Sequence, residues 1–343
     1  MRTLIKTCLK LLVVAALLGW LVHSDKLHLD QLKILVSNPW IAVGNLAVWG
    51  IGSVLLGTFR WWLLLRGLGL VVSFFRALRL QLIGLFFNTT MPGAVGGDII
   101  KAVYIIREQS KQSKTAAMLT VLLDRVVGLG ALFVMAATAV LVNPGFFFSQ
   151  SNLAPLAIFI FVGLGGLLVG YAVVMYPFKE GRDPFRWLFT RNLPGLNKIH
   201  GIYDALRAYR KHPWLLIATV LISVVIQSGA VMYGLFLTHV LTGQAPDLDV
   251  FCTIYPLGVM TTALPLAPGG LGLGHVAFER LFTMVGLTGG ANIFNVIVLG
   301  QLSLNLLGVI PYVLYRSSFA SLREMEAEIE AQMEPQLEPN ISC

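Results

Sequence analysis

Residues 89–101 read TTMPGAVGGDIIK, and residues 262–274 read TALPLAPGGLGLG. Thr, Pro, Ala, Gly and Gly recur in both stretches at a single offset of 173 residues. Clustered proline and glycine interrupt a helix, because proline lacks the amide donor and glycine lowers helix propensity. The two stretches therefore predict two matching breaks in otherwise helical segments.

Long apolar runs surround both breaks. Of the 343 residues, 56% are hydrophobic and 12% are charged, about half of the ~25% charged share of a soluble domain. A bilayer crossing needs about 20 apolar residues. The chain has charge-free runs of about this length or longer at residues 40–59, 80–97, 126–178, 213–246, 250–278 and 281–315. We predict an all-α polytopic membrane protein with about six full transmembrane helices.

Other classes of protein lack support in the sequence. The three cysteines have no paired or metal-ligand spacing, so we expect neither a disulfide scaffold nor a metal site. No HExxH, Walker loop, nucleophile elbow or CxxC spacing occurs, and we expect no catalytic residue and no cofactor. The net charge of +8 does not indicate nucleic-acid binding, because no soluble basic domain carries it. Residues 11–22 resemble a signal peptide without a small-residue cleavage site, which predicts a retained first helix.

Lysine and arginine positions predict the topology. Cytoplasmic loops of membrane proteins are enriched in these residues. On this basis the N-terminus, the 60–79, 101–114 and 177–212 segments and the C-terminus are expected in the cytoplasm. The connections at 23–39, 143–145 and 247–249 are expected outside. The pattern predicts a multi-pass protein of the cytoplasmic (inner) membrane with both termini inside.

This topology requires two re-entrant helical hairpins. The run 80–97 has cytoplasmic flanks on both sides and is too short to cross twice, so it turns back at Pro92–Gly97. The run 250–278 enters from outside and returns outside, with Pro265 and Pro268 among its breakers. The hairpins thus enter from opposite faces. The simpler alternative is that these glycines and prolines only permit close helix packing.

The repeat offset also organises the domain. Pro39-Trp40 and Pro213-Trp214 open corresponding spans at an offset of 174 residues. We predict a single transmembrane domain over 1–318, with inverted structural repeats at about 39–142 and 213–316. A linking helix and basic cytoplasmic loop occupy about 152–212, and 319–343 form an acidic cytoplasmic tail. Interrupted segments at matching positions of inverted halves point to a transporter's central site.

The first break contains candidate head-group ligands. A helix that begins at Gly96-Gly97-Asp98 directs free amides and its positive dipole end into the membrane, which suits a lipid phosphate. Lys101, one turn later, adds a positive charge. The alternatives are that Asp98 only caps the helix and that Lys101 only snorkels to the interface.

Two adjacent charges lie deep in the next apolar segment. Asp124 and Arg125 come about ten residues after its start, where charges are costly and face a cavity or each other. Adjacent residues point about 100° apart on a helix. Arg125 either binds phosphate or forms a structural ion pair with Asp98 or Asp124, and Asp124 is a candidate polar lining or proton-coupling residue.

The second break offers a matching set. Gly269 and Gly270 are candidate contacts for the lipid head group. His275 and Glu279 are four residues apart, on one face if this segment is helical, and they are candidates for proton coupling. The alternative places Glu279 and its neighbour Arg280 at the external interface as solvated charges.

The combination of PGAVGGD with Lys101, then Asp124-Arg125, then PGGLG resembles the lysylphosphatidylglycerol synthase transmembrane-region family of flippase-like membrane proteins. The resemblance covers about residues 5–318. In that family similar domains occur alone or fused to lipid-modifying or glycosyl-transferring domains, and fused aminoacyl-phosphatidylglycerol proteins use this part to move the lipid between leaflets. The positions that the resemblance implies are Pro92, Gly96, Gly97, Asp98, Arg125, Pro268, Gly269, Gly270 and Gly272.

Two positions depart from the family pattern. The family usually has arginine near Lys101, and lysine keeps the charge but loses the bidentate fork. It commonly has glutamate at the position of His275, so a carboxylate role falls to Glu279 one turn later. We expect no aminoacyl-transferring domain after Arg323, and therefore no autonomous lysyl-lipid synthase.

The sequence favours a transporter over an enzyme. The leading hypothesis is a flippase or scramblase that moves an anionic, phosphate-bearing lipid or lipid-linked precursor, with membrane lipids as its partners. The first alternative is a membrane-embedded transferase that acts on a lipid phosphate. The second is a non-catalytic partner that docks a lipid-modifying or glycosyl-transferring enzyme through the 177–212 loop.

Overall fold

The computed structural model describes residues 32–90, 96–108, 114–178, 183–184, 196–263 and 272–314. These residues are predominantly helical, and no strand occurs among them. The helices are α2 (Leu32–Ser37), α3 (Pro39–Asn45), η2 (Leu46–Leu56), α4 (Gly57–Gly67), α5 (Phe74–Thr90), α6 (Gly96–Glu108), α7 (Lys114–Val142), α8 (Pro144–Ser149), α9 (Ala154–Met175), α11 (Leu196–Ala208), η4 (Tyr209–Lys211), α12 (Pro213–Thr242), α13 (Leu248–Thr262), α14 (Leu273–Met284), α15 (Gly290–Asn305), η6 (Leu306–Gly308) and α16 (Val309–Leu314).

Five helical segments within the described ranges are long and apolar enough to cross a membrane. They are Pro39–Gly67, Thr115–Val142, Ala154–Met175, Pro213–Thr242 and Gly290–Leu314. This confirms a multi-pass, all-helical membrane protein. The predicted N-terminal helix lies outside the described residues, as does the predicted acidic tail.

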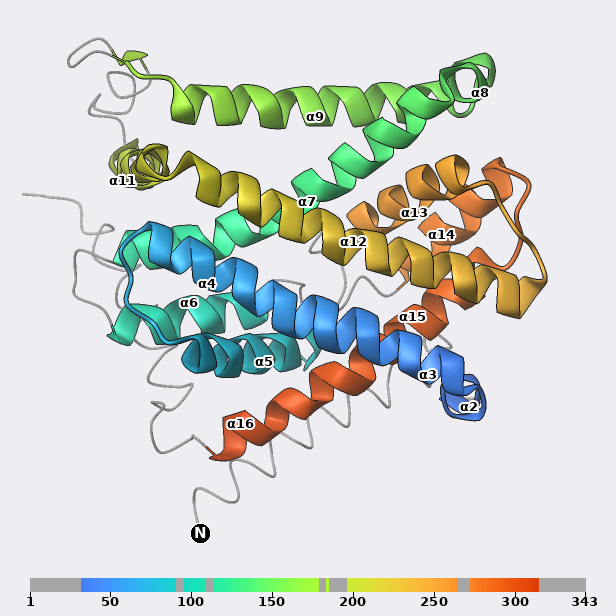
Figure 1. Ribbon diagram of the computed structural model, residues 1–343, viewed down its shortest axis with the longest axis horizontal. Helices are drawn as coiled ribbons and strands as arrows, with labels where there is room; N and C mark the ends of the chain where they lie inside the picture. Colours follow the sequence, from blue (N-terminus) through green and yellow to red (C-terminus); the bar gives the residue numbers. More distant parts are fainter. Residues whose placement is uncertain are drawn as a thin grey trace, which may run out of the picture.

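Short helices lie at the two ends of the long ones. In Figure 1 the segment from α3 to α4 runs beside α12, whereas α7 and the α15–α16 segment cross this pair at an angle, and α9 lies along one edge of the bundle. The short pair α5 and α6 packs together near the end of α4, and the short pair α13 and α14 packs together near the opposite end of α12. The two pairs of short helices therefore lie at opposite ends of the described bundle (Figure 1).

The first span contains an unusual segment. Asn38 caps α3 by accepting a hydrogen bond from the Trp40 amide at 3.0 Å, and Pro39 occupies the first turn. The helix then continues as the π-helix η2 for 11 residues before α4. π-Helical turns are rare and are frequent at functional sites. Pro213 similarly begins α12, so both prolines of the repeated Pro-Trp pair start a span.

Apolar side chains form two packing centres. The larger surrounds α13 and α14, where Phe251, Tyr255, Phe278 and Phe282 are buried against α7, α12 and α15. The smaller surrounds α5 and α6 and includes the fully buried Trp61 of α4. Each pair of short helices is thus held in its own apolar cluster.

The described part of the basic connection includes the helix α11. Within it, α11 packs against α7 and α9. The Arg207 guanidinium donates to the Asp183 carboxylate, and the Tyr203 hydroxyl donates to the same carboxylate at 3.0 Å. Burial, with the neighbouring Asp183 carboxylate, raises the pKa of Tyr203 above its ordinary value. These contacts hold the start of the connection against α11.

Candidate functional site

Asp98 lies at the centre of a buried ionic cluster. It occupies the first turn of α6, where a negative charge is favoured by the helix dipole. Its carboxylate accepts from Lys101 Nζ at 3.1 Å and from Arg125 Nε of α7. The Asp98 side chain is 7% exposed. Asp98 therefore pairs with two cations as well as occupying the helix start, and of the two ion pairs predicted for Arg125 the one with Asp98 is formed.

Lys101 points into the protein. Its side chain is 5% exposed, and its ammonium donates to Gln81 Oε1 at 3.0 Å. The ammonium also lies 4.9 Å from the centroid of the Trp61 ring, a cation–π distance. These contacts replace water on a charge that the apolar surroundings make costly to bury. The geometry therefore does not fit the alternative that Lys101 only snorkels to the interface.

Asp124 and Arg125 have different partners, as the 100° rotation between neighbours predicts. Asp124 accepts from Arg60 Nε of α4 at 2.7 Å, and Arg60 Nη1 also donates to the Ser223 hydroxyl of α12 at 2.9 Å. This ion pair joins α4, α7 and α12. Because truncation of one partner leaves the other buried and unpaired, such a pair constrains the three helices strongly.

The described ion pairs of these residues fall into two groups. Arg60 pairs with Asp124, whereas Asp98 is shared by Lys101 and Arg125. Four of these side chains are at most 12% exposed, but Arg125 is 32% exposed. Arg125 is thus the most accessible member of this ionic cluster.

The start of α6 lies very close to α5. The Gly97 amide donates to Asn88 Oδ1 at 2.8 Å, so Asn88 satisfies one of the free amides of the helix start. A Cβ atom on Gly97 would lie 1.7 Å from the Gly84 carbonyl oxygen. Only glycine allows this approach. Gly96 is the residue before it and is half-buried.

His275 and Glu279, in the second half, have separate hydrogen-bond partners. His275 Nδ1 accepts from the Gly272 amide at 3.3 Å at the start of α14, and its Nε2 lies 3.5 Å from Asn295 Oδ1 of α15. Glu279 is exposed and accepts from the Ala291 amide at 2.9 Å, near the start of α15. Both residues hold α14 against α15 through these contacts.

Several predicted positions lie outside the described residues: Pro92, Pro265, Pro268, Gly269 and Gly270.

Sequence reasoning missed three members of the ionic network. The charge pattern places Arg60 in the basic loop that follows the 40–59 run, whereas in the structure Arg60 lies seven residues before the end of the span. The apolar residues 61–65 that follow Arg60 are the available signal. Gln81 and Ser223 carried no such signal, because an uncharged polar residue in an apolar helix commonly bonds its own backbone.

The chain matches the family model described as the lysylphosphatidylglycerol synthase TM region over residues 8–309. It is 22% identical over 257 residues to the UPF0104 membrane protein PH1989 of Pyrococcus horikoshii, and this alignment covers 68% of this chain and 74% of that protein. It is also 22% identical over 307 residues to a UPF0104 membrane protein of Methanothermobacter thermautotrophicus, covering 83% and 85% of the two chains. No solved structure gives a significant match. The family match confirms the resemblance seen in the motifs, and the chain belongs to the lysylphosphatidylglycerol synthase transmembrane-region family.

Proposed function

We propose that this protein is a flippase or scramblase that moves an anionic, phosphate-bearing lipid or lipid-linked precursor between the leaflets of the cytoplasmic membrane. The observation that carries the proposal is the buried Asp98 carboxylate, which is shared by Lys101 and the partly exposed Arg125. Charges inside apolar segments are costly and commonly mark substrate pathways. A phosphate that enters beside Arg125 pairs with its guanidinium.

The short helix pairs support a transporter architecture. With 17 and 13 residues, α5 and α6 reach about 26 and 20 Å at 1.5 Å per residue, less than the ~30 Å hydrocarbon core. With 15 and 12 residues, α13 and α14 are also short. The proposal treats the two pairs as re-entrant hairpins of inverted repeats that enter from opposite faces. Their separation to opposite ends of the long helices favours this assignment (Figure 1).

The orientation follows from the charged connections. The end of α9 and the start of α12 flank the basic segment, and they lie at the same end of the bundle as α5 and α6 (Figure 1). Under the positive-inside rule this end faces the cytoplasm, with both termini on that side. The ionic cluster then lies in the cytoplasmic half of the membrane.

The mechanism is an exchange of partners at Arg125. In the resting state its guanidinium is neutralised by Asp98, and the same carboxylate holds Lys101. A lipid phosphate takes the place of Asp98 on Arg125, while Asp98 stays paired with Lys101. Movement of one half of the bundle against the other then exposes the head group to the opposite leaflet. His275 and Glu279 remain proposed as proton-coupling residues.

The first test is lipid transport after reconstitution. In liposomes with a labelled anionic lipid, the native protein is expected to speed movement between leaflets over empty vesicles. Arg125→Ala is expected to slow it by about tenfold or more, since one charge-assisted hydrogen bond contributes ~1.5–3 kcal/mol. The measurement is the rate at which the labelled lipid moves from the inner to the outer leaflet, where a membrane-impermeant quencher outside the vesicles can react with it.

The matched control is Arg280→Ala, which removes an exposed arginine of α14. It is expected to transport at the native rate. Native transport no faster than empty vesicles across a panel of anionic lipids would count against the proposal. A new lipid species in cells that express the protein, missing from a deletion strain, would instead support the transferase hypothesis.

A further inference from the structure

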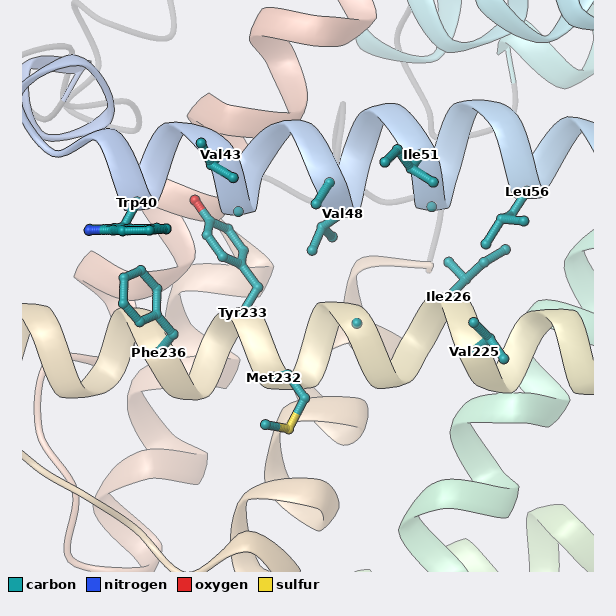
Figure 2. Close-up of a pocket in the computed structure, with 14 residues that line it drawn as sticks. Trp40, Val43, Val48, Ile51, Leu56, Val225, Ile226, Met232, Tyr233 and Phe236 are labelled. Carbon is teal, nitrogen blue, oxygen red and sulfur yellow. The ribbon is translucent and has the colours of Figure 1, made fainter.

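The first span has two unlike surroundings along its length. Between α3–η2 and α12 it borders an apolar groove of about 530 Å³, and Figure 2 shows the side chains of the two helices facing each other across it. No charged residue is among the described side chains that line this groove. Farther along the span, the Trp61 ring of α4 instead lies 4.9 Å from the ammonium of Lys101. The charge chemistry of this span is therefore concentrated where α4 meets α6.

The Lys101 side chain is held by residues of α4 and α5. A Cβ atom on Gly84 would lie 2.8 Å from the Lys101 Cγ and Cδ atoms, so the missing side chain of Gly84 leaves room for the alkyl part of Lys101. The Trp61 indole nitrogen donates to the Thr120 hydroxyl of α7 at 3.2 Å, and this bond fixes the ring beside the ammonium. Gly84 and Trp61 thus set the position of the Lys101 charge.

The described oxygen acceptors of the Lys101 ammonium are Asp98 Oδ1 at 3.1 Å and Gln81 Oε1 at 3.0 Å. Gln81 is 7% exposed, so its amide takes the place of water on the ammonium. The other carboxylate oxygen, Asp98 Oδ2, pairs with Arg125. A continuous series of contacts therefore runs from Gln81 through Lys101 and Asp98 to Arg125.

We infer that Gln81 is a positioning residue for the exchange of partners at Arg125. The inference rests on the proposed function, because it concerns the same exchange. A phosphate takes Arg125 from Asp98 at low cost only if Asp98 keeps another cation, since an unpaired buried carboxylate is unfavourable. Gln81 holds that cation in place, and because its amide is uncharged, it does so without competing strongly with the Asp98 carboxylate for the ammonium.

Two substitutions of Gln81 are expected to act on Arg125 in opposite directions. In Gln81→Glu a second carboxylate takes part of the Lys101 ammonium, so Asp98 holds Arg125 more tightly. In Gln81→Met no acceptor remains at this position, so Lys101 relies on Asp98 and Arg125 is released more readily. A residue that only packs α5 against α6 would change the hold on Arg125 in the same direction in both variants.

A third variant removes the ammonium itself. Lys101→Met leaves one carboxylate, Asp98, with one cation, Arg125, at a similar side-chain volume. It is expected to tighten the pair of Asp98 and Arg125, as Gln81→Glu does. Because the remaining charges stay paired, this variant keeps the comparison with Gln81→Met decisive if Gln81→Glu does not fold.

The experiment is chemical modification of Arg125 in nanodiscs of phosphatidylcholine, which requires neither transport nor an anionic lipid. The reagent is phenylglyoxal, which reacts with arginine side chains, and peptide mass spectrometry gives the rate at Arg125 relative to the exposed Arg280 of α14. Gln81→Glu and Lys101→Met are expected to slow the reaction at Arg125 about threefold, near the lower end of the coupling within one ion-pair network. Gln81→Met is expected to speed it by a similar factor.

Gln244→Glu is the matched control. Gln244 lies two residues after the end of α12 that is opposite to α5 and α6 (Figure 1). Its Oε1 accepts from the Thr288 amide at 3.0 Å, a bond that a carboxylate keeps. The variant adds the same charge far from Arg125, and Arg125 is expected to react at the native rate.

The remaining outcomes separate the two proposals. Equal rates in the native protein and the variants, or a change in the same direction in Gln81→Glu and Gln81→Met, would overturn the role of Gln81. A second set of nanodiscs, made from equal parts of phosphatidylglycerol and phosphatidylcholine, tests whether the anionic lipid protects Arg125 from the reagent. Protection without any effect of Gln81 would remove the positioning role alone. The opposite effects of the Gln81 variants without protection would support that role and count against a head-group site at Arg125.

Discussion

Asp98→Asn is expected to lower the free energy of unfolding by about 3–5 kcal/mol, the usual cost of breaking a buried ion pair. The asparagine cannot neutralise Lys101, whose side chain is 5% exposed, and Arg125 loses the same partner. The buried Lys101 and the partly exposed Arg125 then lack the carboxylate that both are paired with. The measurement is chemical unfolding of the purified protein in detergent micelles, followed by circular dichroism.

Two variants accompany this measurement. Asp247→Asn changes an exposed carboxylate before α13 that makes no capping hydrogen bond, and it is expected to unfold with the native protein. Adding Lys101→Met to Asp98→Asn removes one of the two unbalanced cations at similar volume, so part of the stability is expected to return. A single variant as stable as Asp247→Asn, or a double variant less stable than the single one, would contradict the ion pairs described for Asp98.

Gly97→Ala is expected to destabilise the protein by about 1–3 kcal/mol or more, the cost of overpacking a close contact. The new methyl group would lie 1.7 Å from the Gly84 carbonyl oxygen, and backbone atoms of α5 cannot rotate away as a side chain can. The two helices must therefore separate, which also strains the hydrogen bond from the Gly97 amide to Asn88. The midpoint of thermal unfolding in detergent provides the measurement.

Gly165→Ala is the control for this substitution. Gly165 lies within α9, and a Cβ atom there meets nothing within 4 Å. In a helix interior the alanine is favoured over glycine by about 0.8–1 kcal/mol, so this variant is expected to be as stable as the native protein or slightly more stable. If Gly97→Ala and Gly165→Ala unfold at the same temperature, the close approach of α5 and α6 is wrong.

The spans could be predicted because they depend on local composition. A run of apolar residues must leave water whatever its neighbours are, and proline at a helix start removes an amide that has no partner there. The spans at Pro39 and Pro213 and the helix over Ala154–Met175 therefore follow from residues adjacent in the chain. The separate directions of Asp124 and Arg125 follow from helix geometry alone.

The partners of the charges could not be predicted in the same way. Arg60 and Asp124 are 64 residues apart, and Arg60 and Ser223 are 163 apart. The sequence restricts such contacts only by sign and depth. Arg125 had two candidate carboxylates, and the position of α6 against α7 selects Asp98 over its neighbour Asp124.

By itself the sequence determined that this is a multi-pass helical membrane protein of one family, and that a few charges lie inside its apolar segments. Only the tertiary structure decided that Arg60 pairs with Asp124, that Asp98 is shared by Lys101 and Arg125, and that two distant spans line an apolar groove. The physical reason is the range of the interactions. Hydrophobicity and helix propensity act on each segment separately, whereas ion pairs and cavities exist only once separate helices have packed.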